Sequence, residues 1–402
     1  MLCRSLINSL NYRLFTLILF CLGWLSDAVA DNSKYVILIT IDGMHAGMVT
    51  DPEMPSPYLK MMKREGLFVD KVKGVPPTAT YPSHTSIVTG ALPVHHRIFY
   101  NAPFVFNKDS VVSYWYADSI KVPTIWQAAK ESGFTTASLF WPVSTKSRWI
   151  DYNIPEYWSV KRVANQLDFI KPVCTPSGIL DELEENAVGR LDHLTFGAGS
   201  ITRDARTAHM ANYIMNKYHP NLMTIHLITT DYAQHATGMQ SERTRMAVAS
   251  ADHAIGLIVE NLKQTHRMDS TTIIVCGDHG FSDINRVIAP NVWLTHAGLL
   301  SEKPGGDWKA CFHGNGSVMF LYLRDSNDKE TLEKVENIIQ NLPVETRSLF
   351  KVVSQKELTA MGGDPKVALA LEPIAGISVS TNRTGADVLV KEGGSHGYFS
   401  GI

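Results

Sequence analysis

Carboxylate and imidazole side chains follow three apolar runs of this 402-residue chain, at the point where each run ends. The runs cover residues 35–41, 222–229 and 271–276, and the polar residues that follow them are Asp42, Asp231, His235, Asp278 and His279. Carboxylate oxygen and neutral imidazole nitrogen are ligands that zinc accepts in proteins. A single Asp after a strand is more often a helix cap, and a single His is more often a satisfied polar group. The recurrence of such residues at several run ends favours a metal centre.

Two of these pairs differ in the backbone that they need. Asp231 and His235 form an Asp-x-x-x-His pattern, which can present two ligands to one ion from a loop after a strand. Asp278 and His279 are adjacent, and neighbours in a strand point to opposite faces, so this pair can share an ion only from irregular backbone. A further histidine, His396, stands between glycines, where a backbone can approach a site closely.

A hydroxyl suited to nucleophilic attack lies in a Pro- and Thr-rich stretch that predicts a turn running into a short helix. Pro82 has a fixed φ that suits the first turn of a helix, and Gly90 is a natural stop just past the last turn. We therefore expect Thr80 at or just before a helix N-terminus, where free N–H groups and the helix dipole favour negative charge. Taken alone, this hydroxyl is either a cap or a nucleophile, and Thr78 and Ser83 are alternative caps.

Alternating strand and helix patterns must position these side chains. Continuous β-branched runs are typical of strands that are covered on both faces of a parallel sheet. The expected strands cover 35–41, 67–72, 135–141, 222–229 and 271–276, and the expected helices cover 56–65, 124–132, 202–218 and 242–262. This order predicts an α/β fold with a doubly wound, mainly parallel central sheet. Ligands collect at the carboxyl ends of the strands in such sheets, so we expect Thr80 and the metal-type residues at one edge.

Two tracts interrupt this pattern. Residues 143–200 carry Pro, Gly and charge clusters, and they predict an irregular insertion over the core with a short helix near 179–188. Residues 292–382 predict a compact inserted α+β lobe, with strands at 317–323, 349–353 and 376–380 and helices at 329–341 and 355–361. The core is therefore expected to cover 31–291, and the chain is expected to return to it over 383–402.

The first 30 residues predict a cleavable signal peptide. Arg4 and Arg13 flank a polar start, a short apolar run follows, and Ala28-Val29-Ala30 offers a small-x-small cleavage site. The alternative is an uncleaved membrane anchor, although the run is short for a span. We expect a secreted or periplasmic protein without a membrane span in the mature chain.

Composition bounds the remaining classes. The formal net charge is −2, which argues against a binder of nucleic-acid duplexes. The cysteines beyond the predicted signal peptide are Cys174, Cys276 and Cys311, so at most one disulfide can form among them.

Taken together, the motifs resemble the type I phosphodiesterase/nucleotide pyrophosphatase family of the alkaline phosphatase superfamily. They occur in the family order and span residues 36 to 398. The residues that carry the resemblance are Ile41-Asp42-Gly43, Pro77-Thr78-Ala79-Thr80-Tyr81-Pro82-Ser83-His84, Val88-Thr89-Gly90, His96 through Asn101, Pro123-Thr124-Ile125-Trp126, Phe140-Trp141-Pro142, Asp231-Tyr232-Ala233-Gln234-His235 with Gly238, Gly277-Asp278-His279-Gly280 and Ser395-His396-Gly397-Tyr398.

The resemblance implies two zinc ions and a set of site residues. One ion would be held by Asp231, His235 and His396. The other would be held by Asp42, Asp278 and His279, with the Thr80 oxygen as a further ligand. Thr80 would be the nucleophile that forms a phospho-threonine intermediate, and Asn101 matches the asparagine that contacts a phosphate oxygen in the family.

Several features depart from the family pattern. Arg97 and Tyr100 stand where the family often has glycines, and Ala79 and Ser83 replace the more usual Lys and Asn around the nucleophile. Relatives usually continue with another strand and a helix after the element that carries His396. The sequence therefore predicts that the returning segment 383–402 is truncated.

Three functions are compatible with these residues. The first is hydrolysis of phosphodiester or pyrophosphate bonds in small nucleotide-type substrates. The second is a phosphomonoesterase or phosphonate hydrolase of the same superfamily, and the third is a non-catalytic secreted binding protein that retains the fold. The sequence specifies neither the leaving group nor the oligomeric state, because the leaving-group pocket lies in loops without a local code.

Overall fold

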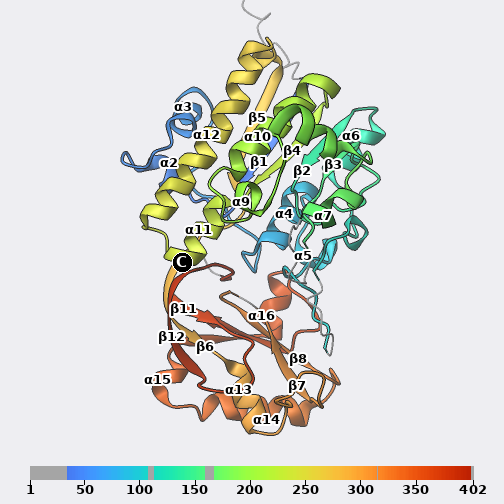
Figure 1. Ribbon diagram of the computed structural model, residues 1–402. Coiled ribbons are helices and arrows are strands. Elements are labelled where there is room, and N and C mark those ends of the chain that lie inside the picture. The colour runs from blue at the N-terminus through green and yellow to red at the C-terminus, as the bar shows by residue number, and fades with distance from the viewer. Residues whose placement is uncertain (1–33, 107–112, 159–166, 315, 400–402) are drawn as a thin grey trace, which may run out of the picture.

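The computed structural model describes residues 34–106, 113–158, 167–314 and 316–399. These residues form an α/β core and a smaller lobe, which lies below the core in Figure 1. The sheet of the core has five strands in the order β3-β2-β4-β1-β5, and every pairing in it is parallel. The strands are β1 (Tyr35–Ile41), β2 (Thr136–Leu139), β3 (Tyr152–Ile154), β4 (Leu222–Leu227) and β5 (Thr271–Gly277). The predicted α/β fold with a mainly parallel sheet is confirmed.

Alternation along β1 explains why helices cover both faces of this sheet. Ile39 is fully buried in the largest apolar cluster, whereas the next residue back, Leu38, packs with Val88 and Trp126 on the opposite face. Such two-sided burial favours the continuous apolar run of β1. The helices on the first face are α3 (Pro57–Glu65), α10 (Arg203–Tyr218) and α12 (Glu242–Gln264), and those on the second are α4 (Thr80–Thr89) and α6 (Ile125–Glu131).

Short elements fill the connections of the core. The predicted helix near 179–188 is present, as an α-helix that continues into a π-helical turn. The short helices are α2 (Gly47–Thr50), α5 (Pro93–His96), η1 (Ala117–Ser119), α7 (Leu167–Ile170), η2 (Lys171–Val173), α8 (Ile179–Leu183), η3 (Glu184–Val188), α9 (His193–Phe196), α11 (Thr229–Thr237) and η4 (Met268–Ser270).

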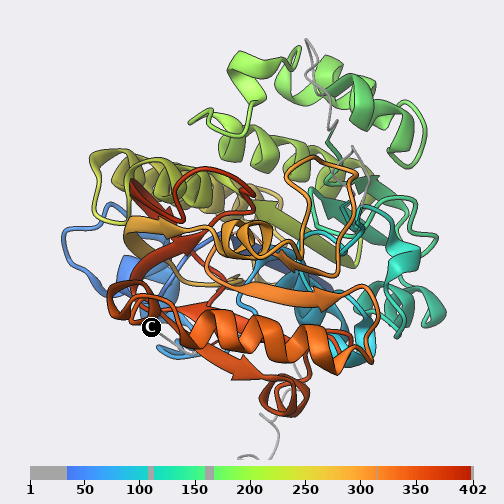
Figure 2. The ribbon, with the colours of Figure 1, turned by 90° about the horizontal axis from the view of Figure 1, so that it is seen from below.

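The lobe contains two further sheets, and Figure 2 shows it in front of the core when the molecule is seen from below. The four-stranded sheet is antiparallel and has the order β7-β8-β10-β9. Its strands are β7 (Ala310–His313), β8 (Met319–Leu323), β9 (Phe350–Ser354) and β10 (Leu369–Pro373), and the helices around it are α13 (Pro290–His296), α14 (Lys329–Gln340), α15 (Val344–Arg347) and α16 (Gln355–Ala360). The side chains of Val335 and Ile339 on α14 are buried against this sheet.

A three-stranded sheet joins the lobe to the site. It has the order β11-β6-β12, with β6 (Ser282–Ile288), β11 (Gly376–Val379) and β12 (Val388–Ser395). Strand β12 runs antiparallel to β6 and ends directly before His396. Strands β6 and β12 lie outside the predicted lobe whereas β11 lies inside it, so this sheet spans the predicted limits. The boundaries 31–291, 292–382 and 383–402 stay a prediction.

The predicted strand over 67–72 is wrong. These residues form neither helix nor strand, and Leu67 and Val72 expose 94% and 81% of their surface. The neighbours of β1 in the sheet are β4 and β5, which come from far along the chain. A local apolar pattern predicts a strand but cannot supply the hydrogen-bonding partner that a strand requires.

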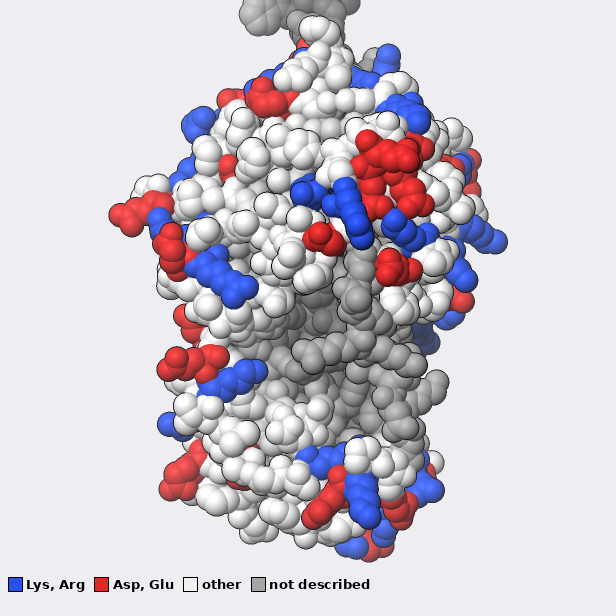
Figure 3. Space-filling model, in the orientation of Figure 1, with Lys and Arg blue, Asp and Glu red and all other residues white. Residues whose placement is uncertain are grey.

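The surface carries both signs of charge. Figure 3 shows acidic and basic side chains interspersed on core and lobe on the face that it displays, in line with the net charge of −2. Among the residues that the structure describes, no helix is both long and apolar enough to cross a bilayer. The predicted signal peptide and its cleavage site lie outside the described residues.

Candidate metal centre

The ends of β1 and β5 bring two aspartates to one edge of the sheet. Ile41 is opposite Gly277 in the register, so Asp42 and Asp278 follow side by side. The amide N–H of Gly43 donates to Asp278 Oδ1 at 3.0 Å. Gly277 permits this close approach, because a Cβ atom there would lie 2.0 Å from the carbonyl oxygen of Met44.

Thr80 lies where the sequence places it, at the start of a short helix. It is the first residue of α4, and Gly90 follows the last residue with a φ of 65°. The N-cap position is occupied by Ala79, whose side chain makes no capping hydrogen bond, and the Thr78 hydroxyl donates instead to the carbonyl oxygen of Tyr398 at 2.9 Å. The hydroxyl of Thr80 therefore points into the site, at the positive end of the helix dipole.

The residues expected around the first ion converge on His279. Its Nε2 atom lies 3.2 Å from Asp42 Oδ1, 3.2 Å from Asp278 Oδ2 and 3.3 Å from Thr80 Oγ1. The backbone after β5 is irregular, which lets Asp278 and His279 face the same point. All four side chains are buried.

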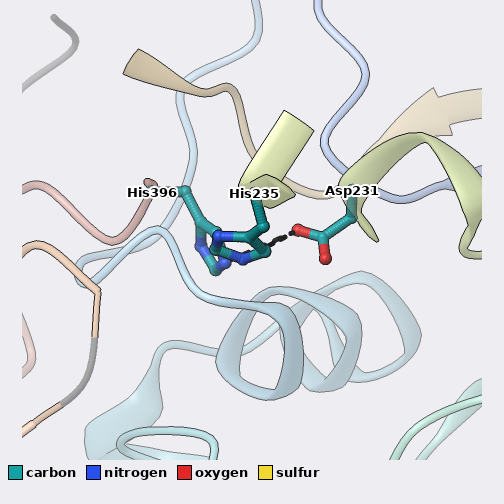
Figure 4. Close-up of side chains that lie close together, drawn as sticks. All are labelled: Asp231, His235 and His396. Carbon is teal, nitrogen blue, oxygen red and sulfur yellow. Dashed lines mark ion pairs between the residues drawn. The ribbon is translucent and has the colours of Figure 1, made fainter. Parts of the chain in front are cut away.

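The residues expected around the second ion also converge. Figure 4 shows Asp231, His235 and His396 pointing toward one another. The Nε2 atoms of His235 and His396 lie 3.4 Å and 3.6 Å from Asp231 Oδ1. Asp231 and His235 stand one turn apart on the helix α11, not on the strand-end loop that we expected, because the chain enters a helix directly after β4. Residues four apart share one face of a helix, so the ligand spacing survives.

Backbone carbonyl groups orient both histidines. The Nδ1 atom of His235 donates to Gly394 O at 3.0 Å, and Nδ1 of His396 donates to Thr78 O at 3.1 Å. Each bond leaves Nε2 free to face Asp231. Such partners fix the ring orientation and the tautomer of metal-binding histidines.

The two ligand groups form one continuous site. Asp231, Asp42 and His279 each offer a ligand atom within 4.8 Å of the others, so Asp231 belongs to both groups. The rings of His279 and His396 stack with centroids 3.6 Å apart. The site is therefore built from the ends of β1, β5 and β12 together with α4 and α11.

Carboxylate oxygens without a hydrogen-bond partner favour the binding of a cation in this cluster. In the described part of the chain, Asp42 Oδ1, Asp231 Oδ1 and Asp278 Oδ2 are buried without a hydrogen-bond partner. Burial and the charge of Asp42 raise the pKa of Asp278 to about 7, and the same two causes raise the pKa of Asp231 well above its usual value. A buried carboxylate without a partner is costly, and a divalent cation removes that cost. The donor atoms and their unpaired oxygens fit metal binding.

Asn101 lies beside the nucleophile candidate. Its Oδ1 atom accepts the amide N–H of Tyr81, the residue after Thr80, at 2.9 Å. This contact brings the carboxamide to the first turn of α4. Its expected contact with a phosphate oxygen stays a prediction.

The family that combines this fold with these residues matches nearly the whole described chain. The sequence model of the family described as Type I phosphodiesterase / nucleotide pyrophosphatase covers residues 36–399. The chain belongs to this family. The resemblance inferred from the motifs is confirmed.

Named relatives of this family align with the chain at low identity. A venom phosphodiesterase of Macrovipera lebetinus is 24% identical over 286 residues, which are 65% of this chain and 28% of the venom protein. The ectonucleotide pyrophosphatase/phosphodiesterase family member 3 of Mus musculus is 25% identical over 276 residues, which are 64% of this chain and 27% of that protein. The chain thus matches little more than a quarter of the length of these relatives.

Solved structures share the fold of this family member. Murine ectonucleotide pyrophosphatase/phosphodiesterase 5 superposes with a TM-score of 0.61 at 18% identity, covering 90% of this chain and 84% of the murine chain. An inactive form of the same murine protein in complex with AMP superposes with a TM-score of 0.60 at 17% identity and the same coverage.

Two further residues of this phosphodiesterase-family chain, one buried and one half-buried, contact the site although the sequence did not predict them. His226 lies on β4, and its Nε2 atom is 3.1 Å from Asp42 Oδ2. Its Nδ1 atom is 3.1 Å from Phe140 O and 3.4 Å from Glu156 Oε2. Burial alone would lower the pKa of His226, but the hydrogen bonds to Asp42 and Glu156 raise it to about 10. The available signal was a histidine near the end of an otherwise apolar strand.

Glu156 also contacts the residue after the nucleophile candidate. Its Oε1 atom accepts the hydroxyl of Tyr81 at 2.8 Å. Nothing local marks this residue, because it follows the short edge strand β3 in a tract that reads as irregular. His84 also supports the first turn of α4, because its Nδ1 atom donates to Thr80 O at 2.8 Å.

Aromatic side chains gather next to Tyr81. The Trp115 ring meets Tyr81 edge-on with centroids 6.1 Å apart, and it meets Tyr157 with centroids 5.6 Å apart. Trp115 belongs to the aromatic run Tyr114-Trp115-Tyr116, which can form either a wall for a ligand or part of the core. The partial exposure of Trp115 and Tyr157 gives the cluster a face that is not sealed in the core.

Proposed function

We propose that this chain is a two-zinc hydrolase that cleaves phosphodiester or pyrophosphate bonds of nucleotide-type substrates through a covalent phospho-threonine intermediate. The observation that carries the proposal is the position of the Thr80 hydroxyl, which lies at a helix N-terminus and 3.3 Å from His279 Nε2. A threonine hydroxyl is a poor nucleophile at neutral pH and needs an activating group. The cluster of buried carboxylates and imidazoles beside it supports metal activation.

The proposal assigns the ligands in two groups. Asp42, Asp278, His279 and the oxygen of Thr80 hold the first zinc, and Asp231, His235 and His396 hold the second. When bound, zinc acts as a Lewis acid that favours the alkoxide form of a hydroxyl and offsets negative charge on phosphate oxygens. The identity of the metal and the number of ions belong to the proposal.

The residues of the chain then have defined tasks in two displacements. Thr80 Oγ1 gives up its proton to solvent water and bonds to phosphorus, while the bond from phosphorus to the leaving oxygen breaks. A water molecule then attacks the phospho-threonine, which restores the Thr80 hydroxyl and releases the second product. The N-terminus of α4 stabilises negative charge on the phosphoryl group, and the carboxamide of Asn101 donates to one of its oxygens.

Two further observations favour a nucleotide-type substrate. The murine structural neighbour was solved in complex with AMP. The rings of Trp115 and Tyr157 are partly exposed and meet edge-on beside Tyr81, the residue after Thr80, so they can stack on a flat base. We further propose a secreted or periplasmic location, which agrees with the predicted signal peptide.

A side-by-side assay tests the proposal. Purified protein is offered p-nitrophenyl phosphate, bis-p-nitrophenyl phosphate and p-nitrophenyl thymidine 5′-monophosphate, each with and without chelator and with zinc restored. We expect the nucleotide ester and the diester to be cleaved faster than the monoester, and chelation to abolish the activity until zinc is added. A faster rate with the monoester would indicate a phosphomonoesterase, and no turnover of any substrate with zinc present would leave a binding protein.

A further inference from the structure

Glu156 connects two arms of the site that are separate in sequence. One arm is the ligand Asp42 at the end of β1, and the other is the first turn of α4, which carries Thr80. Glu156 Oε1 accepts the Tyr81 hydroxyl in a hydrogen bond, whereas Glu156 Oε2 lies at ion-pair distance, 3.4 Å, from His226 Nδ1; the Glu156 side chain is only 13% exposed. We propose that Glu156 is a positioning residue, which orients Asp42 through His226 and holds Thr80 through Tyr81. The inference deepens the proposed function and rests on it for its kinetic part.

The first arm fixes which oxygen of Asp42 faces the metal. His226 Nε2 donates to Asp42 Oδ2 at 3.1 Å. The other oxygen, Asp42 Oδ1, has no hydrogen-bond partner and lies beside His279. His226 is itself held at its other nitrogen, 3.1 Å from Phe140 O and 3.4 Å from Glu156 Oε2. A carboxylate ligand that is held in this way binds metal with less loss of side-chain freedom.

The second arm fixes the residue next to the nucleophile at both ends. The backbone N–H of Tyr81 donates to Asn101 Oδ1 at 2.9 Å, and its hydroxyl donates to Glu156 Oε1 at 2.8 Å. Thr80 precedes Tyr81 directly and its own carbonyl accepts from His84. Small displacements of a reacting group cost rate steeply, so a fixed Tyr81 keeps the Thr80 oxygen in line with phosphorus.

Two substitutions separate the arms. Glu156→Gln keeps an oxygen that accepts the Tyr81 hydroxyl but turns an amide toward His226. Tyr81→Phe removes only the bond to Glu156 and leaves the His226 arm intact. Removing a group that orients a metal ligand typically costs about 10- to 100-fold in metal affinity or activity.

The experiment measures zinc affinity by chelator competition and kcat and KM with the nucleotide ester, on the full chain. We expect Glu156→Gln to weaken zinc binding about tenfold and to lower kcat with little change in KM. We expect Tyr81→Phe to lower kcat while zinc affinity stays unchanged. In the double variant Glu156→Ala with Tyr81→Phe, kcat should fall no further than in Glu156→Ala alone, because both changes break the same contact.

A matched control exists on the far side of the core. Glu182 accepts the Tyr218 hydroxyl at 2.6 Å, so Glu182→Gln and Tyr218→Phe alter the same kind of pair away from the site. Both should leave zinc affinity and kcat unchanged. The inference is overturned if Glu156→Gln and Tyr81→Phe keep zinc affinity and kcat within twofold of the wild type. It is also overturned if zinc affinity and kcat fall as much in the two control variants. An inactive wild-type protein would refute the proposed function. The zinc affinities would still test whether Glu156 orients Asp42 through His226.

Discussion

Thr80 and His279 face each other across the site although 199 positions separate them in the chain. The Oγ1 atom of Thr80 lies 3.3 Å from the Nε2 atom of His279. One residue opens a helix and the other follows an edge strand of the parallel sheet. This contact joins a hydroxyl at a helix N-terminus to the cluster of carboxylates and imidazoles, and it gives that hydroxyl its proposed role.

Replacement of Thr80 by alanine should abolish turnover while zinc stays bound. The loss expected for removal of a nucleophile is at least about 1,000-fold in kcat, or roughly 4 kcal/mol. Zinc content should stay close to that of the wild type, because Asp42, Asp278 and His279 remain. Single-turnover kinetics with the nucleotide ester and metal analysis of the purified variant measure both quantities.

Controls for this variant lie on the same helix. Thr80→Ser keeps a hydroxyl and should retain a measurable rate, and Thr89→Ala, which removes a bond to Thr85 O in the last turn, should retain nearly all of it. Phosphate from a labelled substrate should become attached to Thr80 in wild-type protein after an acid quench. Near-wild-type rates in Thr80→Ala would exclude it as nucleophile.

His235→Ala should remove one metal ion and leave the other. The side chain faces Asp231 from one turn further along α11, and it belongs to the ligand group that contains neither Thr80 nor Asp42. Loss of one of three ligands weakens a zinc site far more than loss of a histidine that belongs to no ligand group does. Bound zinc per chain should fall from two ions to one, as measured by mass spectrometry of the metal. His253→Ala, at an exposed position of α12, is the control, and an unchanged metal count in His235→Ala would refute the assignment of this ligand group.

Of two glycines in one motif, only Gly277 should be sensitive to replacement by alanine. A Cβ atom at Gly277 would lie 2.0 Å from the backbone oxygen of Met44, whereas at Gly280 it would meet no atom within 4 Å. We expect Gly277→Ala to lower the free energy of unfolding by roughly 1–3 kcal/mol and to displace Asp278, since backbone must move. Gly280→Ala should leave both stability and metal content unchanged. Urea unfolding monitored by tryptophan fluorescence compares the two, and equal effects would contradict the close approach at Gly277.

His96 should make the stability of the fold depend on pH. It is buried in the last turn of α5, where Nδ1 accepts the N–H of Ile98 at 3.1 Å and Nε2 lies 3.0 Å from Ser86 Oγ. Burial, with a smaller contribution from the charge of His95, lowers its pKa to about 4. Its unfolded pKa is about 6.5. The stability it contributes is therefore present above pH 6.5 and is lost as the pH falls from 6.5 toward 4.

The measurement is the urea midpoint between pH 4.5 and 7.5. The wild type should lose up to about 3 kcal/mol over the acidic part of this range from His96 alone. His96→Gln should be less stable at pH 7 and should show a flatter profile, whereas His253→Gln should follow the wild type. A His96→Gln profile as steep as that of the wild type would show that other groups carry the dependence.

Local sequence was sufficient for the parts that depend on one element. The β-branched run of β1 and the stop at Gly90 after α4 both follow from short-range conformational preferences. The sequence also predicted that the possible metal ligands lie together, because the carboxyl ends of strands in a parallel sheet share an edge. The strand predicted over 67–72 is wrong because a local apolar pattern contains no information about the neighbouring strand with which it would have to pair.

The sequence by itself thus determined the family, the parallel α/β class of the core and the residue types of the candidate metal centre. Only the tertiary structure decided that Asp231 lies within reach of both ligand groups, that its pair with His235 stands on a helix, and that His226 and Glu156 support the site. Those relationships join side chains that follow β1 and β3 with side chains on β4, α4 and α11, and they depend on strand order and register. Register and strand order are set by packing across the whole sheet, which no single segment of the chain encodes.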